Sequence, residues 1–227
     1  MTLTQLENEL LACRACPLVT YGRGATSWSG VPSPIIFIGE GPGGVEDDYG
    51  APLVGPSGQL LDKALWSVGL TRDKVYVTNV IKCRPEGNRT PTQPECQFCA
   101  SRWLEKEIAL IRPVVIVGLG NVPLQYFLGA DKRITKTRGQ LVQLKNGIWF
   151  MPTFHPAYLL RQEGDQQKKS KWDVFNDFKL ALAKMTELIG EKELKSEQPF
   201  PLLQHFSERK QQRASWLGKI PYVAPIE

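Results

Sequence analysis

The sequence IIFIGEGPGG at residues 35–44 joins a short, wholly apolar run to a glycine-rich loop. Such a run is too short for a helix and is typical of a strand that is covered on both faces, as in a parallel sheet. Three similar runs follow at residues 75–80, 114–119 and 148–153, and the first extends over residues 34–38. They predict four buried strands.

Segments with apolar residues at helical spacing lie between and after these runs, at residues 58–68, 94–111, 121–128 and 172–189. Strands that alternate with helices favour right-handed crossovers. We therefore predict an α/β fold, a three-layer α/β/α arrangement with a central four-stranded parallel sheet. In such sheets ligands bind beyond the carboxyl ends of the strands, so the loops after the strands are the candidate site.

The composition is that of an ordinary globular protein, with 227 residues, 42% hydrophobic and 22% charged. No apolar run reaches the ~18 residues of a membrane span, and the N-terminus lacks a signal-peptide pattern, so we expect a cytoplasmic protein without a membrane partner. We expect one domain over residues 1–189, a partly ordered extension over residues 190–227, and a monomer. The net charge of +5 permits a nucleic-acid partner without establishing one.

The chain has five cysteines, which in a reducing compartment indicate a metal site or catalysis rather than disulfides. Two C-x2-C pairs, Cys13 with Cys16 and Cys96 with Cys99, could form a four-thiolate zinc site that leaves out Cys83. A second partition uses Cys13, Cys16, Cys83 and Cys99. Four thiolates suit zinc and an iron–sulfur cluster equally well.

The loop at residues 39–44 fits G-x-G-x-x-G, the pattern of dinucleotide-binding sites. Pro42 lies within the turn, and the acidic residues Glu46, Asp47 and Asp48 follow. We therefore expect no helix to begin there and no pyrophosphate to bind. Carboxylates at this edge could place a water molecule or stabilise a developing cation, although we expect at least two of the three to be solvated.

His155 follows the last strand between Pro152 and Pro156, which restrict its backbone. A histidine held there can direct a hydrogen bond at a ligand, whereas we expect no role for His205 in the extension. Basic residues gather at the same edge and predict a groove for phosphates. The candidates for DNA binding are Arg84, Arg89, Arg138 and Arg161.

In combination, these motifs resemble family 4 of the uracil-DNA glycosylase superfamily, the iron–sulfur uracil-DNA glycosylases. The resemblance covers residues 6–184. The matching stretches are Gly39-Glu40-Gly41-Pro42-Gly43 with Glu46-Asp47, Val54-Gly55 with Gly58-Gln59-Leu60-Leu61, Thr78-Asn79-Val80-Ile81-Lys82-Cys83-Arg84-Pro85, Gly87-Asn88-Arg89, and His155-Pro156-Ala157.

The resemblance implies hydrolysis of the N-glycosidic bond of deoxyuridine in single- or double-stranded DNA, which releases uracil. It implies a [4Fe–4S] cluster on Cys13, Cys16, Cys83 and Cys99, with Cys96 as a spare. His155 would donate to the uracil oxygen, and Glu40 or Glu46 would be the catalytic carboxylate. The implied substrate-binding residues are Gly39, Gly41, Leu53, Asn79 and Asn88, of which Asn79 would read the uracil edge.

One position departs from the family pattern: Leu53 stands where the family usually has a phenylalanine that stacks on uracil. A leucine keeps the apolar contact and loses the flat face. This departure leaves open a glycosylase for another deaminated base. Together with the mild net charge, it also leaves open an iron–sulfur DNA-binding or sensing module with a degenerate pocket. A redox electron carrier is a further alternative.

Overall fold

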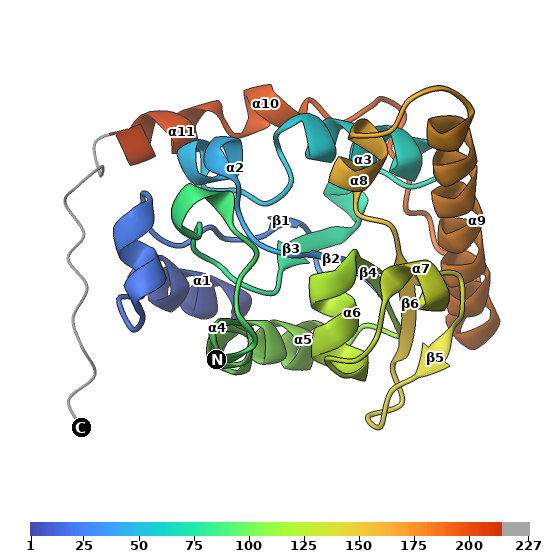
Figure 1. The fold of residues 1–227 in the computed structure, drawn as a ribbon, viewed down its shortest axis with the longest axis horizontal. Coiled ribbons are helices and arrows are strands. Elements are labelled where there is room, and N and C mark those ends of the chain that lie inside the picture. The colour runs from blue at the N-terminus through green and yellow to red at the C-terminus, as the bar shows by residue number, and fades with distance from the viewer. Residues whose placement is uncertain (215–227) are drawn as a thin grey trace.

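The four predicted strands form the parallel centre of the sheet in the computed structural model, which describes residues 1–214 (Figure 1). They are β2 (Ile35–Gly39), β3 (Tyr76–Asn79), β4 (Val115–Leu119) and β6 (Trp149–Thr153). Nearly every residue in them is buried, which explains why each reads as a continuous apolar run.

Within residues 1–214 the sheet has six strands in the order β1-β3-β2-β4-β6-β5, so the predicted total of four is wrong. The two additional strands, β1 (Ser29–Gly30) and β5 (Val142–Gln143), pair antiparallel at the two edges. Each is two residues long and polar in part, and such a segment is too short to show a period.

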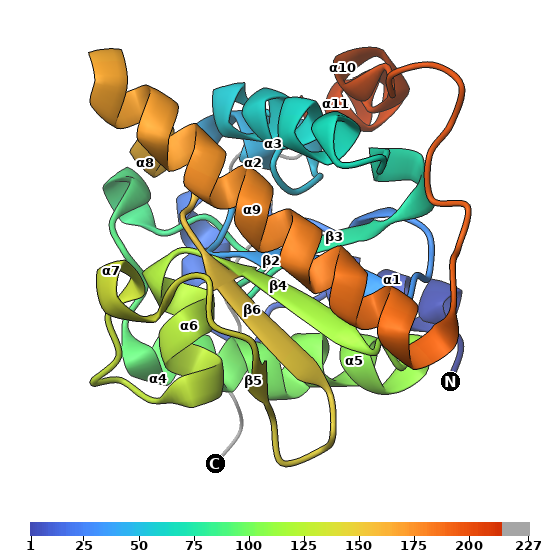
Figure 2. The same ribbon diagram turned by 90° about the vertical axis from the view of Figure 1, so that its right-hand side faces the viewer.

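Helices cover both faces of this mixed sheet, as predicted (Figures 1 and 2). One face carries α1 (Leu3–Leu11), α4 (Gln93–Cys99), α5 (Glu105–Ile111) and α6 (Asn121–Leu128), with the π-helical turn η4 (Ala100–Leu104) joining α4 to α5. The other carries α3 (Pro56–Ser67), α8 (Pro156–Leu160) and the long helix α9 (Gly164–Ile189).

The remaining short elements lie in the connections. They are η1 (Pro17–Tyr21), α2 (Gly44–Tyr49), η2 (Arg72–Lys74), η3 (Glu86–Asn88) and α7 (Ile134–Thr137). None of the helices within residues 1–214 is both long and apolar enough to cross a membrane.

Helix α2 begins directly after the glycine-rich loop, where the sequence predicted no helix. The Gly43 N–H donates to the Glu46 carboxylate at 3.2 Å, in the manner of a helix N-cap, and acidic residues in a first turn favour the helix dipole. The charges that disfavour a phosphate at this point therefore stabilise the helix. The acidic residues are also less solvated than expected, because Asp47 is 3% exposed and Glu46 is hydrogen-bonded.

After α9 the chain runs back over the molecule. The Thr71 N–H donates to Leu194 O at 2.9 Å, and α10 (Leu202–His205) and α11 (Ser207–Ala214) then lie beside α2 (Figure 1). Residues 190–214 are thus placed, while the rest of the predicted extension lies outside the described residues. The domain boundary at residue 189 stays a prediction.

The order of the parallel strands positions the site. β2 lies between β3 and β4, so the chain leaves β2 to one side and later returns to its other side. A crevice forms beyond the carboxyl ends of the strands at such a switch point. The loops after β2, β3, β4 and β6 all open onto it.

Candidate active site

A cleft of about 650 Å³ lies at this edge of the sheet and is lined by the loops that follow all four parallel strands. It brings together eight of the predicted site residues: Glu40, Gly41, Glu46, Leu53, Asn88, Arg89, His155 and Arg161. Residues that are more than 100 positions apart in the sequence therefore share one cavity.

Asn79 ends β3 directly opposite Gly39 of β2, just behind the cleft. Its side chain is buried, and neither its Oδ1 nor its Nδ2 has a hydrogen-bond partner among the described residues. A Cβ on residue 39 would lie 2.4 Å from Asn79 Oδ1, so only glycine allows the amide this position. An unpaired buried amide costs free energy, and it is explained if a ligand completes its hydrogen bonds.

His155 is the N-cap residue of α8. Its Nδ1 accepts the Ala157 N–H at 3.1 Å, which assigns the ring proton to Nε2. Burial lowers the pKa of His155 to about 4, and the positive charge of Arg161 acts in the same direction. At neutral pH the side chain is therefore an uncharged imidazole that presents one N–H donor.

Glu40 follows β2 and lines the cleft. Its side chain makes no hydrogen bond or ion pair with another residue of the described chain. Burial raises the pKa of Glu40, and Arg161 acts in the opposite direction. This carboxylate is thus available to a ligand or to water.

Glu46 differs from Glu40 because both oxygens of its carboxylate already accept hydrogen bonds. Oε1 accepts the N–H groups of Val54 at 3.0 Å and Gly55 at 2.8 Å, and Oε2 accepts that of Gly43. The side chain ties the glycine-rich loop to the loop at residues 52–55. We call the latter the cleft loop. The geometry gives Glu46 a structural part in the cleft wall.

Leu53 occupies the cleft loop with a φ of 51°, in the left-handed region that a leucine seldom adopts. Arg72 holds this conformation: its guanidinium donates to Pro52 O at 3.2 Å and to Leu53 O at 2.9 Å, and it pairs with Asp62. Arg72 is buried, and no motif in the sequence indicated this role. Three of its five partners are backbone carbonyls, which a sequence motif does not identify.

The predicted DNA-binding arginines do not all face the cleft. Arg161 and Arg89 line it, although Arg89 also pairs with Glu95 and lowers the pKa of that carboxyl to about 2. Arg84 donates to Asn88 Oδ1 at 2.7 Å and so fixes the loop after β3. Arg138 lies apart from the cleft lining, where its Nε donates to Asp177 at 3.0 Å.

Four of the five cysteines share one region, between the end of α1 and the loop after β3. Cys83 and Cys99 are buried, and Cys13 and Cys16 pack half-buried against the same core. Burial raises the pKa of Cys83 well above its usual range, and Cys99, Cys16 and Cys13 all act in the same direction. Cys96 has different neighbours, because Glu40 and Glu95 are the charges that act on it.

Comparisons with known proteins show the family to which this chain belongs. Residues 28–179 match the uracil DNA glycosylase superfamily. The type-4 uracil-DNA glycosylase of Thermotoga maritima is 43% identical over 164 residues, 69% of this chain and 82% of the relative. That of Archaeoglobus fulgidus is 34% identical over 203 residues, 85% of this chain and 96% of the relative.

A further relative comes from a neighbouring group. The type-5 uracil-DNA glycosylase of Pyrobaculum aerophilum is 31% identical over 189 residues, 67% of this chain and 81% of the relative. The resemblance read from the motifs is thereby confirmed. The chain belongs to the uracil DNA glycosylase superfamily and, within it, to the type-4 uracil-DNA glycosylases.

Proposed function

We propose that this protein is a DNA glycosylase that hydrolyses the N-glycosidic bond of deoxyuridine in DNA, releasing uracil and leaving an abasic site. One observation carries the proposal: an unpaired carboxylate, Glu40, and a neutral imidazole N–H donor, His155, line the same cleft. The names of its relatives support the same reaction.

The chemistry separates charge as the bond breaks. The sugar becomes cationic, the departing uracil becomes anionic, and groups fixed beforehand near each charge lower the barrier. The His155 Nε2–H donates to the uracil oxygen that gains charge. Glu40 faces the cationic sugar or orients the attacking water. We assign the catalytic carboxylate to Glu40 because the Glu46 oxygens are already engaged.

The base is recognised by residues at the inner end of the cleft. The target nucleotide leaves the stack before it can enter the cleft. The unpaired Asn79 amide then bonds the uracil edge, and a cytosine, whose donor and acceptor are exchanged, leaves those bonds unmade. Leu53 covers the base with an apolar contact in place of ring stacking. Arg84, Arg89 and Arg161 meet the phosphates, and a monomer suffices for this arrangement.

The direct test uses oligonucleotides that contain one uracil, incubated with the full-length protein and then cleaved at abasic sites. We expect cleavage at uracil and none at cytosine, in single and double strands. Parallel substrates with hypoxanthine or a thymine mismatch measure which other bases the protein releases, a property that Leu53 is expected to influence. DNA binding without base release would favour the sensing module, and release of hypoxanthine alone would favour a different glycosylase.

The protonation state of His155 predicts how the rate of uracil release depends on pH. Because its pKa is lowered to about 4, the neutral donor is fully present above about pH 5 and is lost only as the pH falls toward 4. The single-turnover rate of uracil release is therefore expected not to fall as the pH rises from 6 to 8, and ionisation of Glu40, whose pKa is raised by burial, can only increase it. A rate that falls as the pH rises through ~6.5, the ordinary histidine pKa, would mean that the reaction needs an imidazolium.

We further propose that Cys13, Cys16, Cys83 and Cys99 hold a [4Fe–4S] cluster. The four thiols fit it, since Cys13, Cys16 and Cys99 are the cysteines that act on the pKa of Cys83, Cys96 is not among them, and all four are free. Within residues 1–214 no group of three metal-binding side chains is arranged to hold a single ion. When bound, the cluster cross-links the N-terminal segment to the DNA-binding loop after β3, and hydrolysis draws no electron from it.

Substituting two cysteines separately tests this assignment. Cys83→Ser is expected to abolish the brown colour and the binding of about four iron and four sulfide per chain. Cys96→Ser is the matched control, because Cys96 is equally buried and has different neighbours, and it should keep both. One zinc per chain in the wild type, or loss of iron from Cys96→Ser alone, would overturn the ligand set.

A further inference from the structure

The C-terminal segment packs on the cleft loop. Leu202 and Phe206 form a small apolar cluster with Ala51 and Val54, separate from the main core. Val54 is also one of the residues whose N–H the Glu46 carboxylate accepts. The segment therefore forms the outer support of a loop whose inner side lines the cleft.

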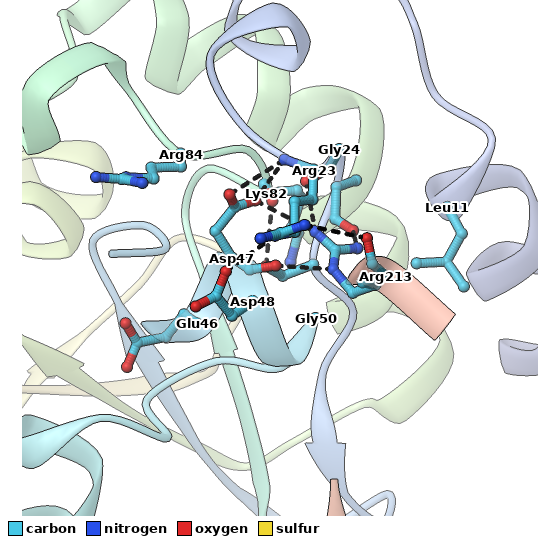
Figure 3. A network of polar contacts seen from close by, with 12 residues as sticks. Leu11, Arg23, Gly24, Glu46, Asp47, Asp48, Gly50, Lys82, Arg84 and Arg213 are labelled. Atoms are coloured by element: carbon cyan, nitrogen blue, oxygen red, sulfur yellow. Dashed lines mark hydrogen bonds and ion pairs between the residues drawn. The ribbon is translucent and has the colours of Figure 1, made fainter. Parts of the chain in front are cut away.

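Arg213 of α11 is the polar centre of this contact and is 1% exposed (Figure 3). Its Nε donates to Asp47 O at 2.8 Å, its Nη1 to Ala25 O at 2.8 Å and its Nη2 to Gly24 O at 3.1 Å. Nη2 also lies 3.3 Å from Asp47 Oδ1, as an ion pair. One guanidinium thus joins the C-terminal helix, the segment after η1 and α2.

Residues at the end of α2 leave space for the Arg213 side chain and provide some of its acceptors. Gly50, which ends α2 with a φ of 67°, would place a Cβ 2.4 Å from the Arg213 Cδ. Asp47 is buried, and its carboxylate also accepts the Arg23 N–H at 2.8 Å. Burial raises the pKa of Asp47, while the Arg23 N–H and the Arg213 charge act in the opposite direction.

Asp47 connects the Arg213 contact to the residues that line the cleft. Asp47 directly follows Glu46 on α2, a helix of six residues, and so short a helix is not stable by itself. Arg213 fixes α2 through Asp47, and Glu46 then fixes the glycine-rich loop and the cleft loop. Arg213 lies outside residues 28–179, the part that matches the superfamily.

We propose that residues 202–214 form a strap that holds α2 in place, and that Arg213 is a positioning residue for the cleft loop, acting through Asp47 and Glu46. It touches neither DNA nor the reacting atoms. The kinetic consequence rests on the proposed function, whereas the structural consequence does not.

Native-state hydrogen exchange of the full-length protein tests the strap. Arg213→Met keeps the length of the side chain and removes its charge and donors. We expect the amides of residues 44–55 to exchange at least about tenfold faster, while those of β2 and β4 are unchanged. Gln211→Met is the control, because Gln211 is exposed on the same helix. Arg213→Lys restores a cation beside Asp47 and is expected to recover part of the protection.

Uracil release gives the second readout. Arg213→Met should lower kcat about 10–100-fold with little change in KM, since a misplaced site slows the reaction more than it weakens binding. Unchanged exchange of residues 44–55 in folded Arg213→Met overturns the strap, as does an equal effect of Gln211→Met. Should Arg213→Met fail to fold, exchange of these residues in Arg213→Lys that is slower than in the wild type would overturn it instead. Should the wild type release no uracil, the proposed function fails, and the exchange experiment still decides on the strap.

Discussion

Replacing His155 by alanine is expected to lower the single-turnover rate of uracil release by about 10²–10³-fold, the usual loss when one donor to a developing anion is removed. DNA affinity should change little, because the donor acts on charge that appears only in the transition state. The measurement compares release from a uracil oligonucleotide with binding of the same strand that carries thymine.

His205→Ala is the matched control for this experiment. His205 is the only other histidine, it is exposed on α10, and it lies outside the cleft lining. Near-normal release by His155→Ala would remove the donor role from His155 without touching the family assignment. Equal losses in both variants would indicate an effect on folding or on the strap, in which His205 lies, and not the loss of a donor.

Glu40→Gln and Glu46→Gln are expected to fail in different ways, although both replace a carboxylate by an amide in the same cleft. Glu40→Gln should lower the rate about 10²–10⁴-fold, as expected when a group that places water or faces a cation is lost. It should not lower the free energy of unfolding, because burial already disfavours the Glu40 charge and no hydrogen bond is lost.

Glu46→Gln should instead destabilise the protein. The amide oxygen can still accept the N–H groups of Val54 and Gly55, but the amide nitrogen cannot accept that of Gly43. Loss of this partly buried hydrogen bond is expected to cost about 1 kcal/mol. Chemical denaturation measures the stability of both variants, and uracil release measures their activity. A stable Glu46→Gln that loses more activity than Glu40→Gln would reverse the assignment of the two carboxylates.

The sequence predicted the central strands and the main helices because buried elements have apolar residues in recognisable patterns. The four parallel strands appear as continuous apolar runs, and α6 begins and ends where its pattern does, at Asn121 and Leu128. The edge strands β1 and β5 were missed because a strand of two residues is too short to show the alternation of apolar and polar residues. α9 begins eight residues before the predicted start, since its first turns are polar and exposed.

The residues that line the cleft were predicted in two ways: from residue types at the ends of strands, and from the family resemblance, which supplied Glu40, Leu53 and Asn88. Glu40, Glu46 and His155 follow strands, so their convergence on one cleft follows from the topology. The different roles that we propose for Glu40 and Glu46 could not be predicted. The sequence does not show which carboxylate accepts hydrogen bonds from the backbone and which does not. Arg72 and Arg213 were missed for a related reason: each recognises backbone carbonyls that distant segments provide.

The contacts of Arg213 also bear on how the protein is made. They join the last described helix to Gly24 and Ala25, 189 and 188 positions earlier in the chain. A growing polypeptide folds from its N-terminal part, so the sheet can assemble while the C-terminal segment is still in the ribosome. The support of α2 is added only after Arg213 has been synthesised. Translation that stops before this residue would release a chain with its sheet formed and its cleft loop unsupported.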